Sequence, residues 1–213
     1  MESFNSVIKF DYFYLAFLLA GIIAAAIAGA LRAAETKMDY TGAVFLAFLT
    51  ANGGGTLRDL LLDQPIFWID NTLFLWIPCF IGLMLFLGRQ YVIDTLSHYR
   101  LKALLLWADA MGLAIFTIIG VEKSLALGQP KEIAATMGIL TAIGGGILSD
   151  IISNRPPLVF STPNHIVVSL FGSLAYLALN SFCKDDLSAI VAAFFMLSLR
   201  AFSIRQQLQR SPF

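Results

Sequence analysis

The sequence has 213 residues, of which 58% are hydrophobic and only 13% are charged, and its mean hydropathy is +0.79. Soluble domains are about half apolar and about one-quarter charged, so this composition excludes an ordinary water-soluble domain. Basic and acidic residues both number 14, and a net charge of zero gives no support for a protein that binds nucleic acid.

Seven apolar segments follow one another along the chain. A membrane-spanning helix needs about 20 mostly apolar residues, and such segments occur at Tyr12–Ala34, Tyr40–Leu62, Leu73–Leu96, Leu101–Gly120, Ile133–Ile152, Leu158–Phe182 and Leu187–Ile204. The first is long enough to span, so we interpret it as a retained helix rather than a signal peptide. The connecting pieces are short, which predicts an all-α integral membrane protein with one transmembrane domain.

Basic residues are distributed unequally between the two faces that these seven spans define. Nine fall near one face: Arg32, Lys37, Arg89, Arg100, Lys102, Arg155, Arg200, Arg205 and Arg210. Four fall near the other: Lys9, Lys123, Lys131 and Lys184. Cytoplasmic loops are enriched in lysine and arginine, so we expect a cytoplasmic C-terminus and an external N-terminus. The last three arginines of the chain fit anchoring to cytoplasmic lipid headgroups.

The sequence contains an internal repeat with an offset of 91 residues. This offset aligns the segment 50–59 (TANGGGTLRD) with 141–150 (TAIGGGILSD), and seven of the ten positions are identical. It also pairs Pro65 with Pro156 and Arg32 with the similar Lys123. Each unit holds three spans, an odd number, so the second unit enters the membrane from the opposite side. We therefore predict an inverted repeat (12–97 and 101–182) followed by a seventh helix (187–205), an arrangement typical of channels and transporters.

Two glycine triplets lie at corresponding positions of the second and fifth spans. They are Gly53, Gly54 and Gly55 in the first unit and Gly144, Gly145 and Gly146 in the second. Each glycine costs a helix up to about 1 kcal/mol relative to alanine, so the triplets are expected to loosen or break these helices. Freed carbonyls attract cations, and neighbouring oxygens can add to them: Thr50, Asn52, Thr56 and Thr141. Close packing of small residues is the alternative interpretation of each triplet.

Ionisable residues deep in apolar segments mark either a solute pathway or bonds inside the bundle. The deepest are Arg58, Asp59, Asp109 and Asp150. Adjacent helical residues point about 100° apart, so we expect Arg58 and Asp59 to find partners on other helices, with Asp109 the first candidate for Arg58. Lys123 is interpreted either as a gating cation or, with more support, as a lysine that extends to the membrane interface.

Other chemistry has little support in the sequence. Neither glycine run is followed by the Gly-Lys-Ser/Thr of a phosphate-binding loop. Cys79, Cys183, His98 and His165 are too sparse for a metal or catalytic site. We therefore expect no enzyme activity and no cofactor.

The segment 53–62 (GGGTLRDLLL), followed by Pro65-Ile66-Phe67-Trp68, resembles the signature of prokaryotic trimeric intracellular cation (TRIC) channels, to which the bacterial glycine transporter family is related. The resemblance covers the whole chain. It implies a homotrimer in the cell membrane of a prokaryote, with one pore per protomer that passes K⁺ and Na⁺. The second and fifth spans are expected to kink at their glycine triplets around this pore. Its alternative is a secondary transporter of a small neutral solute such as glycine.

Two positions depart from the pattern of this family. Ser149 stands where many relatives have arginine, and Leu18 stands where many have an acid equivalent to Asp109. Both departures make the two halves of the chain less symmetric in charge.

Overall fold

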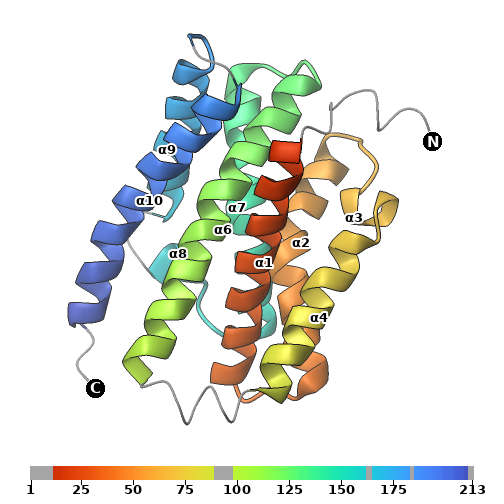
Figure 1. Cartoon of the computed structure of the whole chain (residues 1–213), viewed down its shortest axis with the longest axis vertical. Helices are drawn as coiled ribbons and strands as arrows, with labels where there is room; N and C mark the ends of the chain where they lie inside the picture. Colours follow the sequence, from red (N-terminus) through yellow and green to blue (C-terminus); the bar gives the residue numbers. More distant parts are fainter. Residues whose placement is uncertain (1–11, 89–97, 162–164, 183–184, 211–213) are drawn as a thin grey trace.

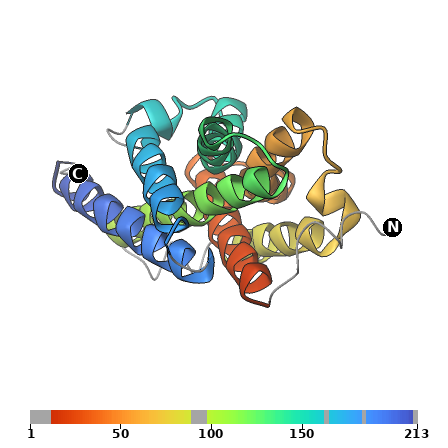
Figure 2. The ribbon, with the colours of Figure 1, turned by 90° about the horizontal axis from the view of Figure 1, so that it is seen from above.

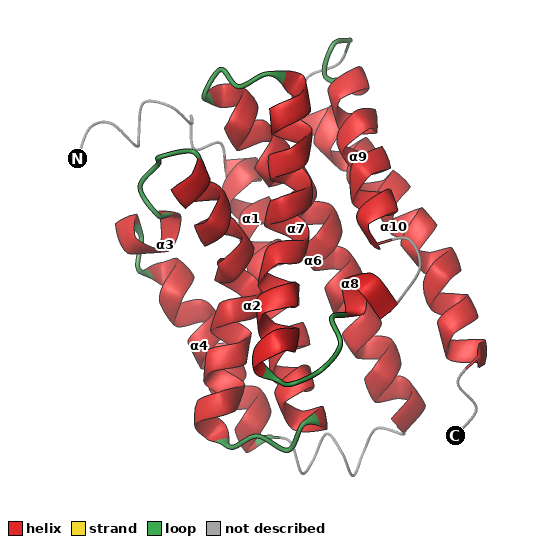
Figure 3. Ribbon diagram, turned by 180° about the vertical axis from the view of Figure 1, so that it is seen from behind, coloured by secondary structure: helices red, strands yellow, loops and turns green. Residues whose placement is uncertain are grey.

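The computed structural model describes residues 12–88, 98–161, 165–182 and 185–210 (Figure 1). These described residues form nine helices and no strand (Figure 3). The helices are α1 (Tyr12–Glu35), α2 (Tyr40–Leu61), α3 (Phe67–Asp70), α4 (Leu73–Leu87), α6 (His98–Ala126), α7 (Lys131–Ile152), α8 (Leu158–Ser161), α9 (His165–Leu179) and α10 (Asp185–Arg210).

The predicted spans and the observed helices differ mainly at their ends. The third span was expected to reach Leu96, but α4 ends at Leu87, and residues 89–97 lie outside the described part of the chain. The expected span Leu158–Phe182 contains two helices, α8 and α9. The expected loop after α2 contains the short helix α3, and α6 and α10 are longer than their apolar cores because charged residues continue both helices.

Four helices are long and apolar enough to cross a membrane: Tyr12–Glu35, Arg100–Ala126, Lys131–Ile152 and Asp185–Leu208. Two shorter apolar helices, Leu73–Leu87 and His165–Leu179, accompany them. The polar segment around its glycine triplet makes α2 less apolar than these four. The protein is therefore all-helical and of membrane type.

The four helices α1, α2, α6 and α7 form the centre of the molecule. Viewed along the long axis, α4 lies on one side of this centre and α9 and α10 lie on the other (Figure 2). Helices α1 and α6 pack side by side and run in opposite directions, and so do α2 and α7 (Figure 1). Each pair joins a helix of the first half to the helix 91 residues further on.

The 91-residue offset also holds for the helix bounds. Helix α7 begins and ends 91 residues after α2, and α8 begins and ends 91 residues after α3. The connecting turns match as well, because Asp63 and Asn154 both have a positive φ, of 52° and 54°. Aspartate and asparagine are the non-glycine residues that tolerate this conformation best. The repeat detected in the sequence is thus present in the local backbone.

Local sequence explains where the central helices begin and end. Asp39 caps α2, since its Oδ1 accepts a hydrogen bond of 2.9 Å from the amide of Gly42. Gly128 follows α6 with a φ of 73°, a left-handed conformation that favours glycine. Pro130 lies directly before α7 and starts the next helix.

Candidate functional site

The glycine triplets lie where α2 crosses α7. A Cβ atom on Gly54 would collide with the backbone carbonyl of Thr141, and a Cβ atom on Gly145 would collide with the backbone carbonyl of Thr50. These two contacts are related by the 91-residue offset. The absence of side chains therefore allows the two backbones to touch, which is the packing interpretation of the triplets.

A break in the helices at the triplets is not observed. Helix α2 continues from Tyr40 to Leu61 and α7 continues from Lys131 to Ile152 through the glycines. The contact between the two backbones explains why glycine is needed without a break. A bend of either helix at its triplet remains a prediction.

One buried polar cluster surrounds Asp59, near the end of α2. Its Oδ1 accepts hydrogen bonds of 2.8 Å from Arg58 Nε and from Lys123 Nζ, and its Oδ2 accepts one of 3.1 Å from the amide of Phe67. Asp59 is fully buried, and Arg58 and Lys123 are only 3% and 6% exposed. The burial of these charges is balanced by their mutual hydrogen bonds. We call these four residues the Asp59 cluster.

Asp59 has the expected partner on another helix, Lys123 of α6, but two other expectations about this cluster are wrong. Arg58 does bind its neighbour Asp59, because the long arginine side chain reaches around the helix end even though the two Cβ atoms diverge. Lys123 does not extend to an interface, because it is buried and bound to Asp59.

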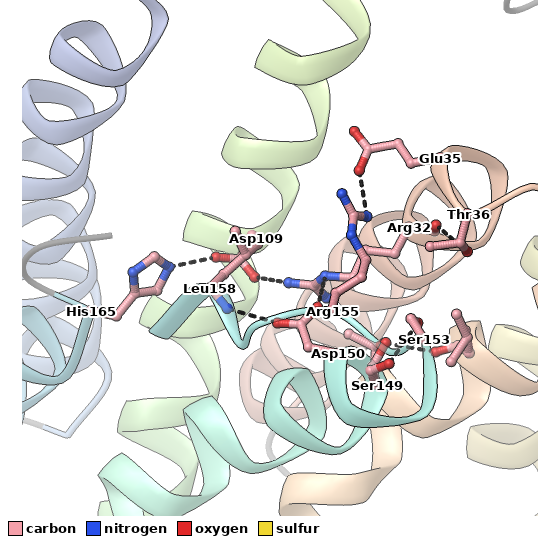
Figure 4. Close-up of polar contacts among 12 residues, drawn as sticks. Arg32, Glu35, Thr36, Asp109, Ser149, Asp150, Ser153, Arg155, Leu158 and His165 are labelled. Carbon is pink, nitrogen blue, oxygen red and sulfur yellow. Dashed lines mark hydrogen bonds and ion pairs between the residues drawn. The ribbon is translucent and has the colours of Figure 1, made fainter. Parts of the chain in front are cut away.

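A second buried cluster surrounds Asp150, near the end of α7 (Figure 4). Arg32 Nε lies 3.2 Å from Asp150 Oδ1, and the amide of Leu158 donates a hydrogen bond of 2.9 Å to Asp150 Oδ2. Arg32 Nη2 also donates to Asp109 Oδ1 at 2.7 Å. On the other side of Asp109, His165 Nε2 lies 3.0 Å from Oδ2. We call these five residues, together with Arg200, the Asp150 cluster.

Arg200 brings α10 into this cluster. Its Nη2 atom lies 3.5 Å from Asp109 Oδ2, and its Nη1 donates to His165 Nδ1 at 3.3 Å. Arginine can only donate, so Nδ1 of His165 accepts and Nε2 carries the proton directed at Asp109. Arg200 is fully buried. The expectation that Arg200 anchors to lipid headgroups is therefore wrong, whereas the exposed Arg205 remains compatible with it.

The predicted bridge from Asp109 to Arg58 is also wrong. Asp109 lies in the first half of α6 and binds Arg32, whereas Arg58 lies near the end of α2 with Lys123, which belongs to the last turn of α6. The two charged groups are at opposite ends of the bundle because α2 and α6 both run from the Asp150 end toward the Asp59 end (Figure 1).

The two clusters share one arrangement. Asp59 corresponds to Asp150 by the 91-residue offset, Lys123 to Arg32, and Phe67 to Leu158. Each acid accepts a hydrogen bond from the backbone eight residues later in its own half. Each also binds a basic side chain from the other half of the chain.

A cavity lies beside each cluster. The Asp59 cavity has a volume of about 30 Å³ and is lined by Tyr14, Leu18, Ala51, Gly55, Arg58, Phe67, Phe74, Phe116, Ile119, Lys123 and Thr141. The Asp150 cavity has a volume of about 20 Å³ and is lined by Arg32, Asp109, Leu113, Ala142, Ile143, Gly146, Ile147, Asp150, Leu158, Val159 and His165. Six lining positions of one cavity match six of the other by the 91-residue offset.

The α2–α7 crossing lies between the two cavities. Gly55 and Thr141 line the Asp59 cavity and Gly146 lines the Asp150 cavity, whereas Gly54 and Gly145 lie at the contact itself. Gly53 and Gly144 also lie at the contact. A Cβ atom added to either residue would lie 3.2 Å from the Cα atom of a glycine on the other helix. The structure thus places one cavity on each side of the helix crossing.

The predicted threonines have separate roles. The hydroxyls of Thr50, Thr56 and Thr141 donate to backbone carbonyls four residues earlier, at 2.7, 2.8 and 2.6 Å. Only Thr141 lines a cavity. Thr56 also accepts a hydrogen bond of 2.9 Å from Trp68 Nε1, so Trp68 is tied to α2.

The Asp150 cavity contains a buried donor. Arg32 is 1% exposed, and its Nη1 atom has no hydrogen-bond acceptor among the described residues. A Cβ atom on Gly146 would meet only Arg32 Nη2, at 3.9 Å, among described atoms. The space beside Gly146 therefore adjoins a guanidinium whose buried Nη1 donor has no acceptor among the described residues.

Sequence reasoning did not assign Arg32, His165 or Arg200 to a site. Arg32 was visible as the repeat equivalent of Lys123, and Arg200 as an arginine within an otherwise apolar span. His165 gave no signal, because its equivalent is Phe74. No cluster of metal ligands occurs in the described ranges, and Cys79 is a half-buried free thiol, whereas Cys183 lies outside those ranges.

Comparisons with known proteins agree with this architecture. The family described as "Glycine transporter" matches the chain twice, at residues 15–90 and 106–181, so the two matches begin 91 residues apart. A UPF0126 membrane protein of Vibrio cholerae is 33% identical over 194 residues, which cover 88% of this chain and 77% of that protein. The UPF0126 inner membrane protein YadS of Escherichia coli is 33% identical over 160 residues, 74% of either chain.

Solved structures of TRIC channels have the same fold. The TRIC channel orthologue from Rhodobacter sphaeroides has a TM-score of 0.83 and 29% identity, and the match covers 91% of this chain and 98% of that one. Another TRIC cation channel, solved to explain conductance, has a TM-score of 0.76 and 32% identity over 94% of this chain and 95% of that one. The chain therefore belongs to the family described as "Glycine transporter", whose fold is that of the prokaryotic TRIC channels.

Proposed function

We propose that this protein is a passive cation channel whose pathway runs through the two cavities and the α2–α7 crossing between them. One observation carries the proposal: two cavities related by the 91-residue offset lie on opposite sides of the backbone contact that the glycine triplets make between α2 and α7. Charged side chains line both of these otherwise mainly apolar cavities, which a purely structural bundle does not need. The similarity to solved structures of TRIC cation channels supports the same function.

The proposal includes seven spanning helices arranged as an inverted repeat. The units are 12–97 and 101–182, with α10 as the seventh span. The antiparallel packing of α1 with α6 and of α2 with α7 supports inversion (Figure 1). We further propose a homotrimer with one pore per protomer in the cell membrane of a prokaryote, with the C-terminus cytoplasmic.

The permeant ions are proposed to be K⁺ and Na⁺. Backbone carbonyls at the crossing and the hydroxyl of Thr141 are oxygen ligands, which hard monovalent cations accept. The described lining residues contain no ring of carboxylates at the crossing, so a preference for divalent cations is not expected.

Single-channel recording of the purified full-length protein in a planar bilayer under a KCl gradient tests this function. Discrete openings that reverse near the K⁺ equilibrium potential are expected. In the variant Gly146→Leu the new side chain occupies the open space beside Arg32, so the conductance is expected to fall several-fold while the protein still purifies as a single species. The matched control is Gly112→Ala, since a Cβ there makes an ordinary contact of 3.5 Å with Ala25 and faces neither cavity.

A second candidate function is secondary transport of a small neutral solute such as glycine. The Asp150 cavity is lined by two carboxylates and by Arg32, which suits a solute with one positive and one negative group. Uptake of labelled glycine into proteoliposomes, with a silent bilayer, would favour this carrier. Channel openings without glycine uptake would contradict it.

A further inference from the structure

The walls of the two cavities carry different charges. The charged residues that line the Asp59 cavity are Arg58 and Lys123, with no acid among its described lining residues. The Asp150 cavity is lined by one cation, Arg32, and by two carboxylates, Asp109 and Asp150. The Asp59 side of the proposed pathway is therefore more positive than the Asp150 side.

The difference arises at positions where the repeat is broken. Arg58 corresponds to Ser149, and Leu18 corresponds to Asp109, by the 91-residue offset. Lys123 and Arg32 correspond to each other, so each cavity has one of these two positive charges and they contribute nothing to the difference. Asp59 is fully buried behind the wall, so the surface facing the cavity is the guanidinium of Arg58 rather than the carboxylate.

On the other side, the extra carboxylate is partly exposed. The side chain of Asp109 is 16% exposed, compared with 5% for Asp150. Its added negative charge is accompanied by the added positive charge of Arg200, which does not line the cavity. The acids that the offset adds at the Asp59 end, Asp70 and Glu122, do not line the cavity, so Arg58 is the group that makes the two walls unequal.

A positive wall lowers the concentration of cations in the cavity that it faces. Cations that enter from the Asp59 end must first occupy this depleted cavity before they reach the crossing. Cations that enter from the Asp150 end reach the crossing without this depletion and meet the positive wall only afterwards. Current that depends on the supply of ions at the entrance is then larger in the second direction.

We infer that Arg58 makes conduction directional: cations pass more readily from the Asp150 end toward the Asp59 end than in reverse. This inference rests on the proposed channel function. In Coulomb's law, one unit charge roughly 7 Å away in a water-filled space changes the local cation concentration about threefold. The current at equal and opposite voltages in symmetric KCl is therefore expected to differ about threefold.

The test is current–voltage recording of single full-length channels in symmetric KCl. Protease cleavage of a C-terminal tag from one chamber establishes orientation, because α10 ends at the Asp150 end (Figure 1). The variant Arg58→Ser copies the Ser149 arrangement, in which a base from the other half and a backbone amide hold the acid, so it is expected to fold. Arg58→Ser should bring the ratio of the currents at equal and opposite voltages close to one. The control Arg205→Ser, which removes an exposed cation of α10, should leave this ratio unchanged.

A second variant covers the case in which Arg58→Ser does not assemble. Leu18→Asp adds a carboxylate to the wall of the Asp59 cavity at the position equivalent to Asp109 and should also lower the ratio. Raising KCl from about 0.1 M to about 1 M shortens the screening length from about 10 to about 3 Å and should lower the ratio in the unmodified protein.

The outcomes separate the two proposals. A silent unmodified protein contradicts the channel itself. A conducting protein with equal currents in both directions, or an Arg58→Ser channel with an unchanged ratio, overturns the inference and leaves the channel standing.

Discussion

The two ends of the molecule solve the same electrostatic problem with different surroundings. At one end, Asp59 holds Arg58 and Lys123, so a single carboxylate serves two basic groups. At the other end, Asp150 shares Arg32 with Asp109, which also meets His165 and Arg200. The common part follows the repeat, and the differences lie at positions that have diverged. The Asp59 end therefore depends on one carboxylate, whereas the Asp150 end distributes its charged groups over four helices, α1, α6, α7 and α10.

The largest loss of stability is expected when the carboxylate of Asp59 is removed, because two basic groups depend on it. Asp59→Asn removes the acceptor shared by Arg58 and Lys123, and loss of one partner from a buried ion pair costs about 3–5 kcal/mol. Asp150→Asn should cost clearly less, because Arg32 keeps its 2.7 Å hydrogen bond to Asp109. Thermal unfolding of each purified variant, followed by size-exclusion chromatography, measures the difference. Equal losses would contradict the comparison.

Loss of the contacts that Arg200 of α10 makes with the Asp150 cluster is expected to have a smaller effect on stability. Arg200→Met retains the apolar part of the side chain but withdraws its contacts with Asp109 and His165. Hydrogen bonds to charged groups contribute about 1.5–3 kcal/mol, so stability should fall by about that amount. The same unfolding measurement applies, with Arg205→Met as the exposed control. A loss no greater than that of the control would show that α10 is not coupled to the cluster.

Adjacent glycines should respond differently to the same substitution. Gly145→Ala forces a methyl group into the carbonyl of Thr50, and overpacking of this kind costs about 1–3 kcal/mol. Gly146→Ala meets only open space beside Arg32, so the loss should be under about 0.5 kcal/mol. Melting temperatures of the two variants, measured in the same detergent, provide the test. A similar decrease for both would argue against the tight crossing.

The smallest effect is expected for the ion pair between Glu35 at the end of α1 and Arg155 in the turn after α7. Arg155 Nη1 donates to Glu35 Oε2 at 2.6 Å, but the two side chains are 36% and 28% exposed. Exposed pairs contribute up to about 1 kcal/mol, so Arg155→Ala should change stability by less than that. The change should shrink further in high salt, and a salt-independent loss above this limit would contradict the exposed character of the pair.

Much of the fold could be predicted from the sequence because spans and repeats are periodic signals. The 91-residue offset, read from one ten-residue match, recurs in the bounds of α2 and α7 and of α3 and α8. Side-chain partners could not be predicted in the same way. Whether Asp109 meets Arg58 or Arg32 depends on how α1, α2 and α6 pack, which periodicity does not define. The burial of Lys123 and Arg200 likewise required the neighbouring helices.

The glycine triplets also show that a contact between two helices could not be predicted from the sequence of either helix. Their positions could be predicted, but propensity alone favoured a loosened or broken helix, whereas the observed cause is backbone contact between α2 and α7. Propensity describes one helix, and the reason for these glycines lies on another. The trimer, the permeant ion and the orientation remain predictions.

The exchange of ion pairs between the two halves has a consequence for the origin of the chain. Within one half, Arg32 and Asp59 lie at opposite ends of the bundle and cannot meet (Figure 1). Arg32 binds only acids of the other half, and Asp59 binds Lys123 of the other half in addition to its own neighbour Arg58. A half-length ancestor would therefore be self-complementary, with its base and its acid both satisfied by one upside-down copy of itself. Fusion of two such copies would allow the two ends to diverge, as the difference between Arg58 and Ser149 illustrates.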